Sequence, residues 1–190
     1  MEFQELSIHG VYRLDARWIG DQRGGFARLF CQQEFEPYLG QGLIRQINLS
    51  INRERGTVRG LHYQNPPHAE IKIVSCVVGS IFDVVIDLRR GSSTFLHWLG
   101  IELSAENRHA VLIPHGCAHG FQTLAEDSEL LYFHTEYYTP GAEGGMRYDD
   151  PRLGIEWPLP PINLSDRDVA HPLIAPGYVG IAIPNLESIR

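Results

Sequence analysis

The stretch "IPHGCAHGFQ", residues 113–122, decides the fold. It places Pro114, Gly116 and His119 in the spacing P-x-G-x-x-H. Two strand-length apolar runs, residues 110–113 and 120–124, lie at its two ends. The motif therefore lies in a part of the chain that is predicted to be rich in β-structure.

Short alternating segments continue on both sides of this motif. Residues 43–51 alternate well, with Gln46, Asn48 and Ser50 on one face and apolar residues on the other. Further strand-length runs, divided by turn residues, are 71–78, 81–88, 97–103 and 129–135. Helix is scarce: residues 32–39 could form two turns, and residues 166–170 one turn capped by Ser165. This pattern predicts an antiparallel sandwich or barrel.

The P-x-G-x-x-H spacing resembles the second motif of the cupin fold. The fold class that we predict is therefore all-β, a cupin double-stranded β-helix or jelly-roll barrel with a few short helices. Metal-binding cupins pair the motif histidine with an H-x-H on an earlier strand and a carboxylate. The corresponding stretch here is His62-Tyr63-Gln64, so the second histidine ligand is missing. A catalytic metal site needs about three good ligands, so we expect no metal.

Composition limits the classes of partner. The 190 residues are 43% apolar, enough for one core, and we expect one domain over residues 1–190. A net charge of −7 without a basic block argues against nucleic acid or membrane as a partner, so an anionic ligand must be bound in a pocket. Three cysteines without C-x-x-C spacing argue against a disulfide framework, and the sequence has no long apolar run. Its first residues are acidic and polar, so we expect no signal peptide. We expect a cytoplasmic protein.

The stretch "RGLHYQNPPHAEIK", residues 59–72, concentrates Arg59, His62 and Lys72. On a regular strand Arg59 and His62 point to opposite faces, but Gly60 between them permits a bend that would bring both into one cavity. Glu70 and Lys72 share a face, and the simplest interpretation is an exposed ion pair worth little.

These side chains also suggest a reaction. Arg59 and Lys72 could stabilise an oxyanion, His62 could take a proton near neutral pH, and Tyr132 could return one. Proton abstraction beside a ketone needs this combination, because the enolate oxygen must be stabilised while the carbon loses its proton. The chemistry suggested is epimerisation.

Seven segments, in order, resemble the dTDP-4-dehydrorhamnose 3,5-epimerase family. They are "RGLHYQ", "DLRRGSSTF", "ELSAENR", "IPHGCAHGF", "YYTP", "DDPRLGIEWP" and "LSDRD". The resemblance extends from about residue 10 to residue 173, and the tail 174–190 has no counterpart in it. It implies a cupin-fold homodimer, without metal or other cofactor, that inverts C3, C5 or both in a nucleotide-linked 4-keto-6-deoxy sugar.

The resemblance also implies roles for individual residues. His62 corresponds to the base and Asp168 to its partner carboxylate. Lys72 matches a lysine near the C4 oxygen, and Tyr132 the acid that returns a proton from the opposite face. The substrate-binding positions that it implies are Arg59, His119, Arg23, Phe26, Gln46, Asn48, Tyr138, Glu143 and Arg147.

Some positions depart from the family pattern. Arg28 stands where the family has an acid, Glu70 where it has glutamine, and Arg167 where it has lysine. Glu70 could hold Lys72 in its charged form or displace it from the substrate. A CDP- or GDP-linked substrate, inversion at one centre only, a sugar-nucleotide 3,4-ketoisomerase and a non-catalytic sugar-binding cupin remain as alternatives.

Overall fold

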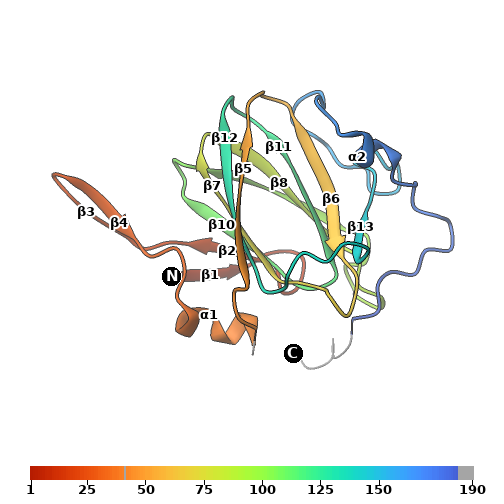
Figure 1. Ribbon diagram of the computed structural model, residues 1–190, viewed down its shortest axis with the longest axis horizontal. Coiled ribbons are helices and arrows are strands. Elements are labelled where there is room, and N and C mark those ends of the chain that lie inside the picture. The colour runs from red at the N-terminus through yellow and green to blue at the C-terminus, as the bar shows by residue number, and fades with distance from the viewer. Residues whose placement is uncertain (41, 184–190) are drawn as a thin grey trace.

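Two antiparallel β-sheets face each other in the computed structural model, which describes residues 1–40 and 42–183 (Figure 1). The first sheet has the order β1 (Glu2–Glu5), β2 (Tyr12–Asp15), β10 (His109–Ile113), β7 (Lys72–Val78), β12 (Ser128–His134), β5 (Gln46–Asn52). The second has the order β13 (Glu143–Gly145), β6 (Val58–Gln64), β11 (Cys117–Thr123), β8 (Ser80–Asp87), β9 (Trp98–Ser104). Strands distant in sequence are neighbours, as in a jelly roll.

The predicted elements of the two sheets are present, with ends that differ by at most three residues from those expected. Both predicted helices have the expected bounds, α1 at Gln32–Leu39 and α2 at Asp166–Ala170. The analysis did not predict β1, β2, β13 or the hairpin of β3 (Trp18–Asp21) and β4 (Gly24–Ala27). These strands have three or four residues each, too few for alternation to be recognised. No helix in the described ranges is long and apolar enough to cross a membrane.

The main hydrophobic core lies between the sheets. It consists of inward-facing residues, among them Val74, Val85, Phe121 and Leu130. This core fills one end of the sandwich. Toward the other end, the side chains on the same inner faces are polar. The apolar end stabilises the sheets, and the polar end is free to bind a ligand.

A second apolar cluster covers the outer face of the second sheet. The described part of the C-terminal tail contributes Ile174 and Ile181 to it, and Ile181 forms a parallel bridge with Arg89. The tail therefore has a structural role up to residue 183. Residues 184–190 lie outside the described residues, and one domain over residues 1–190 stays a prediction.

Strand β6 bends at Gly60. His62 pairs with His119 and Arg59 pairs with Phe121, so two residues of β6 oppose the single residue Gly120 of β11. This bulge turns Arg59 and His62 to the same inner face. Gly60 has φ of 126°, and a Cβ there would lie 2.6 Å from the Cα of Gly120, so the bend requires glycine. The predicted bend is confirmed.

Candidate active site

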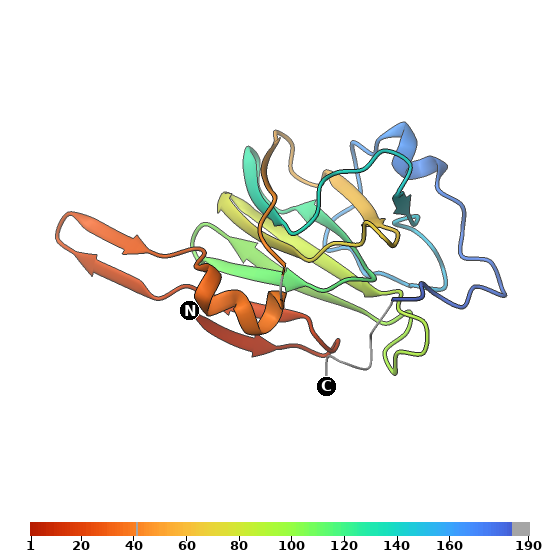
Figure 2. The same cartoon turned by 60° about the horizontal axis from the view of Figure 1, so that its bottom comes forward.

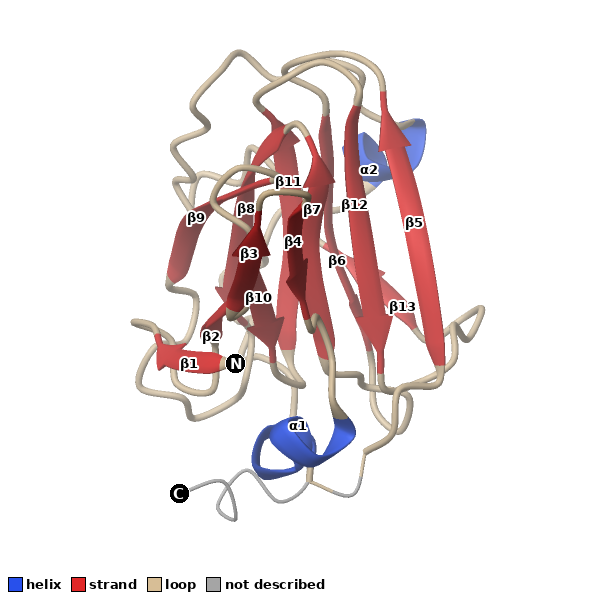
Figure 3. Ribbon diagram, turned by 90° about the vertical axis from the view of Figure 1, so that its left-hand side faces the viewer, coloured by secondary structure: helices blue, strands red, loops and turns tan. Residues whose placement is uncertain are grey.

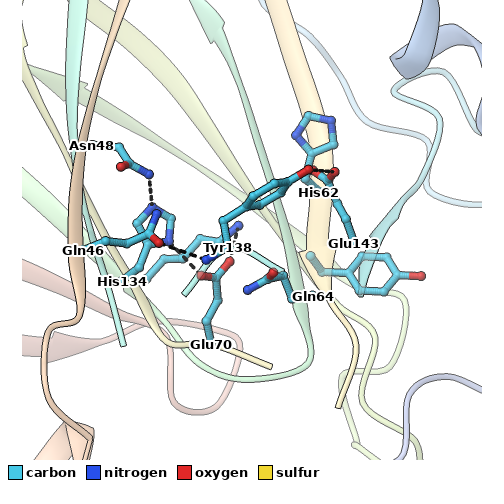
Figure 4. A pocket seen from close by; sticks show the side chains of 10 residues that line it. Gln46, Asn48, His62, Gln64, Glu70, His134, Tyr138 and Glu143 are labelled. Carbon is cyan, nitrogen blue, oxygen red and sulfur yellow. Dashed lines mark hydrogen bonds and ion pairs between the residues drawn. The ribbon is translucent and has the colours of Figure 1, made fainter. Parts of the chain in front are cut away.

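A polar cleft opens between β5, β12 and β7 of the first sheet and β6 of the second (Figure 4). It has an empty volume of about 510 Å³. Its lining residues are Gln46, Asn48, His62, Tyr63, Gln64, Glu70, Lys72, His134, Tyr138 and Glu143. Six of the predicted site residues therefore meet in one place, and the sequence analysis missed Tyr63, Gln64 and His134 as lining residues.

Strand register explains why these polar residues meet. Tyr132 pairs with Asn48, and His134 lies between Gln46 on β5 and Lys72 on β7. Directly paired residues project to the same face of a sheet, so one row of polar side chains crosses three strands. The polar face predicted for residues 43–51 thus lines the cleft with Gln46 and Asn48.

His62 is held by Asp168 at the start of α2. Its Nε2 lies 2.7 Å from Oδ1 of Asp168, whose side chain is buried. The Ser165 hydroxyl accepts a hydrogen bond from the Asp168 backbone N–H, which is the predicted helix cap. Burial raises the pKa of Asp168, but the His62 hydrogen bond and charge outweigh burial and lower it. Since Asp168 occupies the Nε2 side, Nδ1 of His62 is the nitrogen left to take a proton.

Lys72 and Glu70 form a buried pair, not the exposed pair that the sequence suggested. Their side chains are 13% and 7% exposed, with Nζ 3.1 Å from Oε1. His134 Nδ1 lies 2.8 Å from the other oxygen of Glu70. Burial raises the pKa of Glu70, but His134 and Lys72 together lower it. The prediction of an exposed pair was wrong because alternation cannot tell which face the opposite sheet covers.

Tyr132 lies on the inner face of β12, two residues before His134. Its hydroxyl is 3.2 Å from the Ser50 hydroxyl, and its ring meets that of His119 edge to face. Burial raises the pKa of Tyr132 well above its ordinary value, although Ser50 and the charge of Arg59 oppose the rise. The phenol is therefore protonated at neutral pH and can donate a proton.

His119 makes a second buried histidine–carboxylate pair. Its Nε2 lies 2.7 Å from Oδ2 of Asp83 on the neighbouring strand β8. The sequence analysis predicted His119 but missed Asp83. The signal was the presence of Asp83 within the largely apolar run 81–88, because a buried carboxylate needs a partner.

A second cavity, with an empty volume of about 700 Å³, reaches His62 from the α2 side. Arg59 and Arg167 line it together with His62 and Asp168. Arg167 also pairs with Glu143 at 2.7 Å. Two cations thus lie beside His62, where an anionic group of a ligand would be attracted.

Among the predicted binding residues, Arg23, Phe26 and Arg147 line neither the cleft nor the second cavity of their own chain. Arg23 pairs with Asp21, and Phe26 is 66% exposed, both on the β3–β4 hairpin that projects from the sandwich (Figure 2). Arg147 pairs with Asp149.

Arg28, which was expected to replace an acid facing the base of the nucleotide, forms an ion pair with Glu34 in the first turn of α1. This pair engages one nitrogen of the guanidinium, and the Arg28 side chain stays 62% exposed.

One cluster in the described part of the chain has the spacing of a metal site. The possible ligand atoms of His62, Asp168 and His171 lie within 4.8 Å of one another. His171 supplies a third group that the sequence analysis missed. The Arg167 guanidinium, however, lies 3.0 Å from Nε2 of His62, and its positive charge opposes the binding of a metal cation at this nitrogen. This donor set suits a hydrogen-bonded dyad better than a metal ion.

Comparison with known proteins identifies the family. The family model of dTDP-4-dehydrorhamnose 3,5-epimerase matches residues 5–176. The chain belongs to this epimerase family. A dTDP-4-dehydrorhamnose 3,5-epimerase of Salmonella typhimurium is 41% identical over 171 residues, covering 90% of this chain and 93% of the relative. A dTDP-4-dehydrorhamnose 3-epimerase of Streptomyces niveus is 38% identical over 169 residues, covering 88% and 81%.

A solved structure of the epimerase family supports the fold. The Legionella pneumophila 3,5-epimerase in complex with dTDP-4-keto-L-rhamnose has a TM-score of 0.85 and 38% identity, covering 90% of this chain and 92% of that one. The predictions of the family, the all-β cupin fold and the isomerase class are confirmed.

Proposed function

We propose that this epimerase acts on a dTDP-linked 4-keto-6-deoxy sugar and inverts C3 and C5 in deoxysugar biosynthesis. The observation that carries the proposal is the placement of a base and an acid on opposite sheets. His62 belongs to β6 of the second sheet, and Tyr132 belongs to β12 of the first. A sugar bound between the sheets would meet one group on each face, which is what inversion requires.

His62, Lys72 and Tyr132 can together carry out each inversion. Nδ1 of His62 takes the proton from the carbon beside the C4 ketone, and the electron pair of that C–H bond moves to the C4 oxygen to form an enolate. The Lys72 ammonium stabilises the negative charge on this oxygen. The Tyr132 hydroxyl then donates its proton to the opposite face of the carbon, and the enolate returns to the ketone. His62 releases its proton to solvent, and Tyr132 regains one, before the second inversion.

The charges around the cleft support a nucleotide diphosphate as the carrier. Lys72 is paired with Glu70 and Arg167 with Glu143, so Arg59 is the cation beside His62 that has no ion-pair partner among the described residues. A diphosphate would bind there, with the sugar between the sheets. The exposed ring of Tyr138 at the cleft is available to stack on the base, and dTDP is favoured because the relatives are named for it.

We also propose that the protein is a homodimer. Strand β5 is an edge of the first sheet (Figure 3). Its outer face exposes three large apolar residues, Ile47, Leu49 and Ile51, by 56%, 54% and 57%. The hairpin that carries Arg23 and Phe26 projects away from the sandwich (Figure 2). A second copy that covered the apolar edge could receive these two residues at its own cleft.

Three cysteines without disulfides support a cytoplasmic location.

The decisive experiment incubates the enzyme with dTDP-, CDP- and GDP-linked 4-keto-6-deoxy sugars in D₂O. NMR of the products should show deuterium and inversion at C3 and C5 with the dTDP sugar. Exchange at C3 alone would support a 3-epimerase, and migration of the keto group a ketoisomerase. Binding without any exchange would refute the proposed reaction.

A further inference from the structure

Glu70 lies inside the cleft with both of its carboxylate oxygens engaged (Figure 4). Oε1 is 3.1 Å from Nζ of Lys72, and Oε2 is 2.8 Å from Nδ1 of His134. The titratable groups that face it are Lys72 on β7, His134 on β12 and His115 in the loop between β10 and β11. The proposed mechanism gives Glu70 no proton to move, so its presence in the cleft needs another explanation.

The hydrogen bonds around His134 have a defined direction. Nδ2 of Asn48 lies 3.3 Å from Nε2 of His134 and donates to it. A neutral imidazole that accepts at Nε2 carries its hydrogen on Nδ1, so His134 donates to Glu70. Asn48, His134 and Lys72 belong to three adjacent strands of one sheet, which holds the chain of contacts rigidly. His134 therefore holds Glu70 through the carboxylate oxygen that Lys72 does not contact.

This arrangement has two consequences for Lys72. The Lys72 side chain is only 13% exposed, so its ammonium has lost most of its contact with water, and the Glu70 carboxylate at 3.1 Å supplies a charged partner in its place. The contact also restricts a flexible four-carbon side chain and uses only one of three N–H donors. Two donors remain for oxygens of the substrate. Because His134 holds the far oxygen, Glu70 stays beside Lys72 and does not displace it from the cleft.

We infer that Glu70, clamped by His134, is a positioning residue that fixes the Lys72 ammonium against the carbonyl oxygen of the sugar. The inference rests on the proposed function. It assigns to Glu70 and His134 a part in the chemical step without contact with the reacting atoms. A purely structural carboxylate would affect stability but would leave the pH dependence of turnover unchanged.

The test is Glu70→Gln, which preserves shape and removes the charge. We expect kcat to fall about 10- to 100-fold, because the oxyanion would be stabilised by a less ordered and less charged group. The alkaline limb of the kcat profile should also shift relative to the wild type, because the variant lacks the carboxylate charge beside Lys72. KM should change much less than kcat, because substrate binding also uses Arg59 and Arg167.

Two sets of variants separate positioning from stability. Asp87→Asn alters a buried carboxylate that bonds Arg89 and Ser92 outside the cleft, so it should lower Tm without moving the pH profile. His134→Asn keeps an N–H near the position of Nδ1 and should retain more activity than His134→Ala.

The outcomes distinguish the inference from the proposed function. A wild-type enzyme that exchanges no deuterium would refute the proposed function, and the inference with it. An active wild type beside a Glu70→Gln variant with the same kcat and the same alkaline limb would refute the positioning role alone. If Glu70→Gln does not fold, equal kcat values for His134→Asn and His134→Ala would refute that role.

Discussion

Replacing Asp168 with asparagine removes the charge that faces His62 while keeping the shape of the side chain. Asp168 contacts Nε2 of His62 at 2.7 Å on the side away from the proton-accepting nitrogen. The carboxylate stabilises the imidazolium that forms when His62 takes a proton from the sugar, and it fixes the tautomer. Asparagine would still form a hydrogen bond but would carry no charge.

The expected loss follows from Coulomb's law. Two unit charges about 4 Å apart interact by about 4 kcal/mol at an effective dielectric constant of about 20. A remaining neutral hydrogen bond offsets about 1 kcal/mol of this. Since about 1.4 kcal/mol corresponds to a factor of ten in rate, kcat should fall about 10²- to 10³-fold. KM should change little, because Asp168 lies behind His62.

The assay is deuterium uptake from D₂O into the dTDP-4-keto sugar, followed by NMR at C3 and C5, with Tm measured for each variant. Asp166→Asn is the matched control, since it makes the same change at an exposed position of the same helix. It should retain wild-type turnover. If Asp168→Asn folds and keeps kcat within threefold of the wild type, the dyad has no catalytic role.

Four further predictions concern the active site and the proposed dimer interface. Tyr132→Phe should still exchange deuterium at the carbon that His62 deprotonates while forming little inverted product, because the opposite face then lacks its proton donor; inversion at the wild-type rate would remove Tyr132 from the mechanism. Exhaustive chelation with EDTA should leave the rate unchanged, and a rate restored only by added Zn²⁺ or Fe²⁺ would contradict a side-chain mechanism. Leu49→Glu on the exposed apolar edge should shift the protein toward the monomer in light scattering, and an unchanged mass would contradict the proposed interface. Glu70 and Asp168 both have a lowered pKa in the folded protein, so their contribution to stability is complete above about pH 4.5 and is lost as the pH falls through the folded-state pKa values. Tm should therefore fall less steeply from pH 5 to pH 3 in Glu70→Gln than in the wild type, and parallel curves would contradict this linkage.

Local patterns in the sequence were enough to predict most of the fold. Alternation predicted the long strands, because neighbouring side chains on a strand point to opposite faces whatever the partner strand is. The bounds of α2 and its Ser165 cap were also correct, since a cap depends on residues within one turn. The ordered motifs identified the epimerase family. His62 and Asp168 lie in those motifs, and the same resemblance implies Lys72 and Tyr132.

Other features depend on contacts between residues distant in sequence, and only the tertiary structure decided them. Alternation separates the two faces of residues 43–51 but does not say which face the second sheet covers. The same uncertainty made Glu70 and Lys72 look like an exposed pair, whereas the sandwich buries both and adds His134. Gly60 permitted a bend, but pairing with β11 created the bulge that turns Arg59 and His62 to one side. A strand sequence determines the order of its side chains along each face, and the packing of the two sheets determines which of those faces becomes an active site.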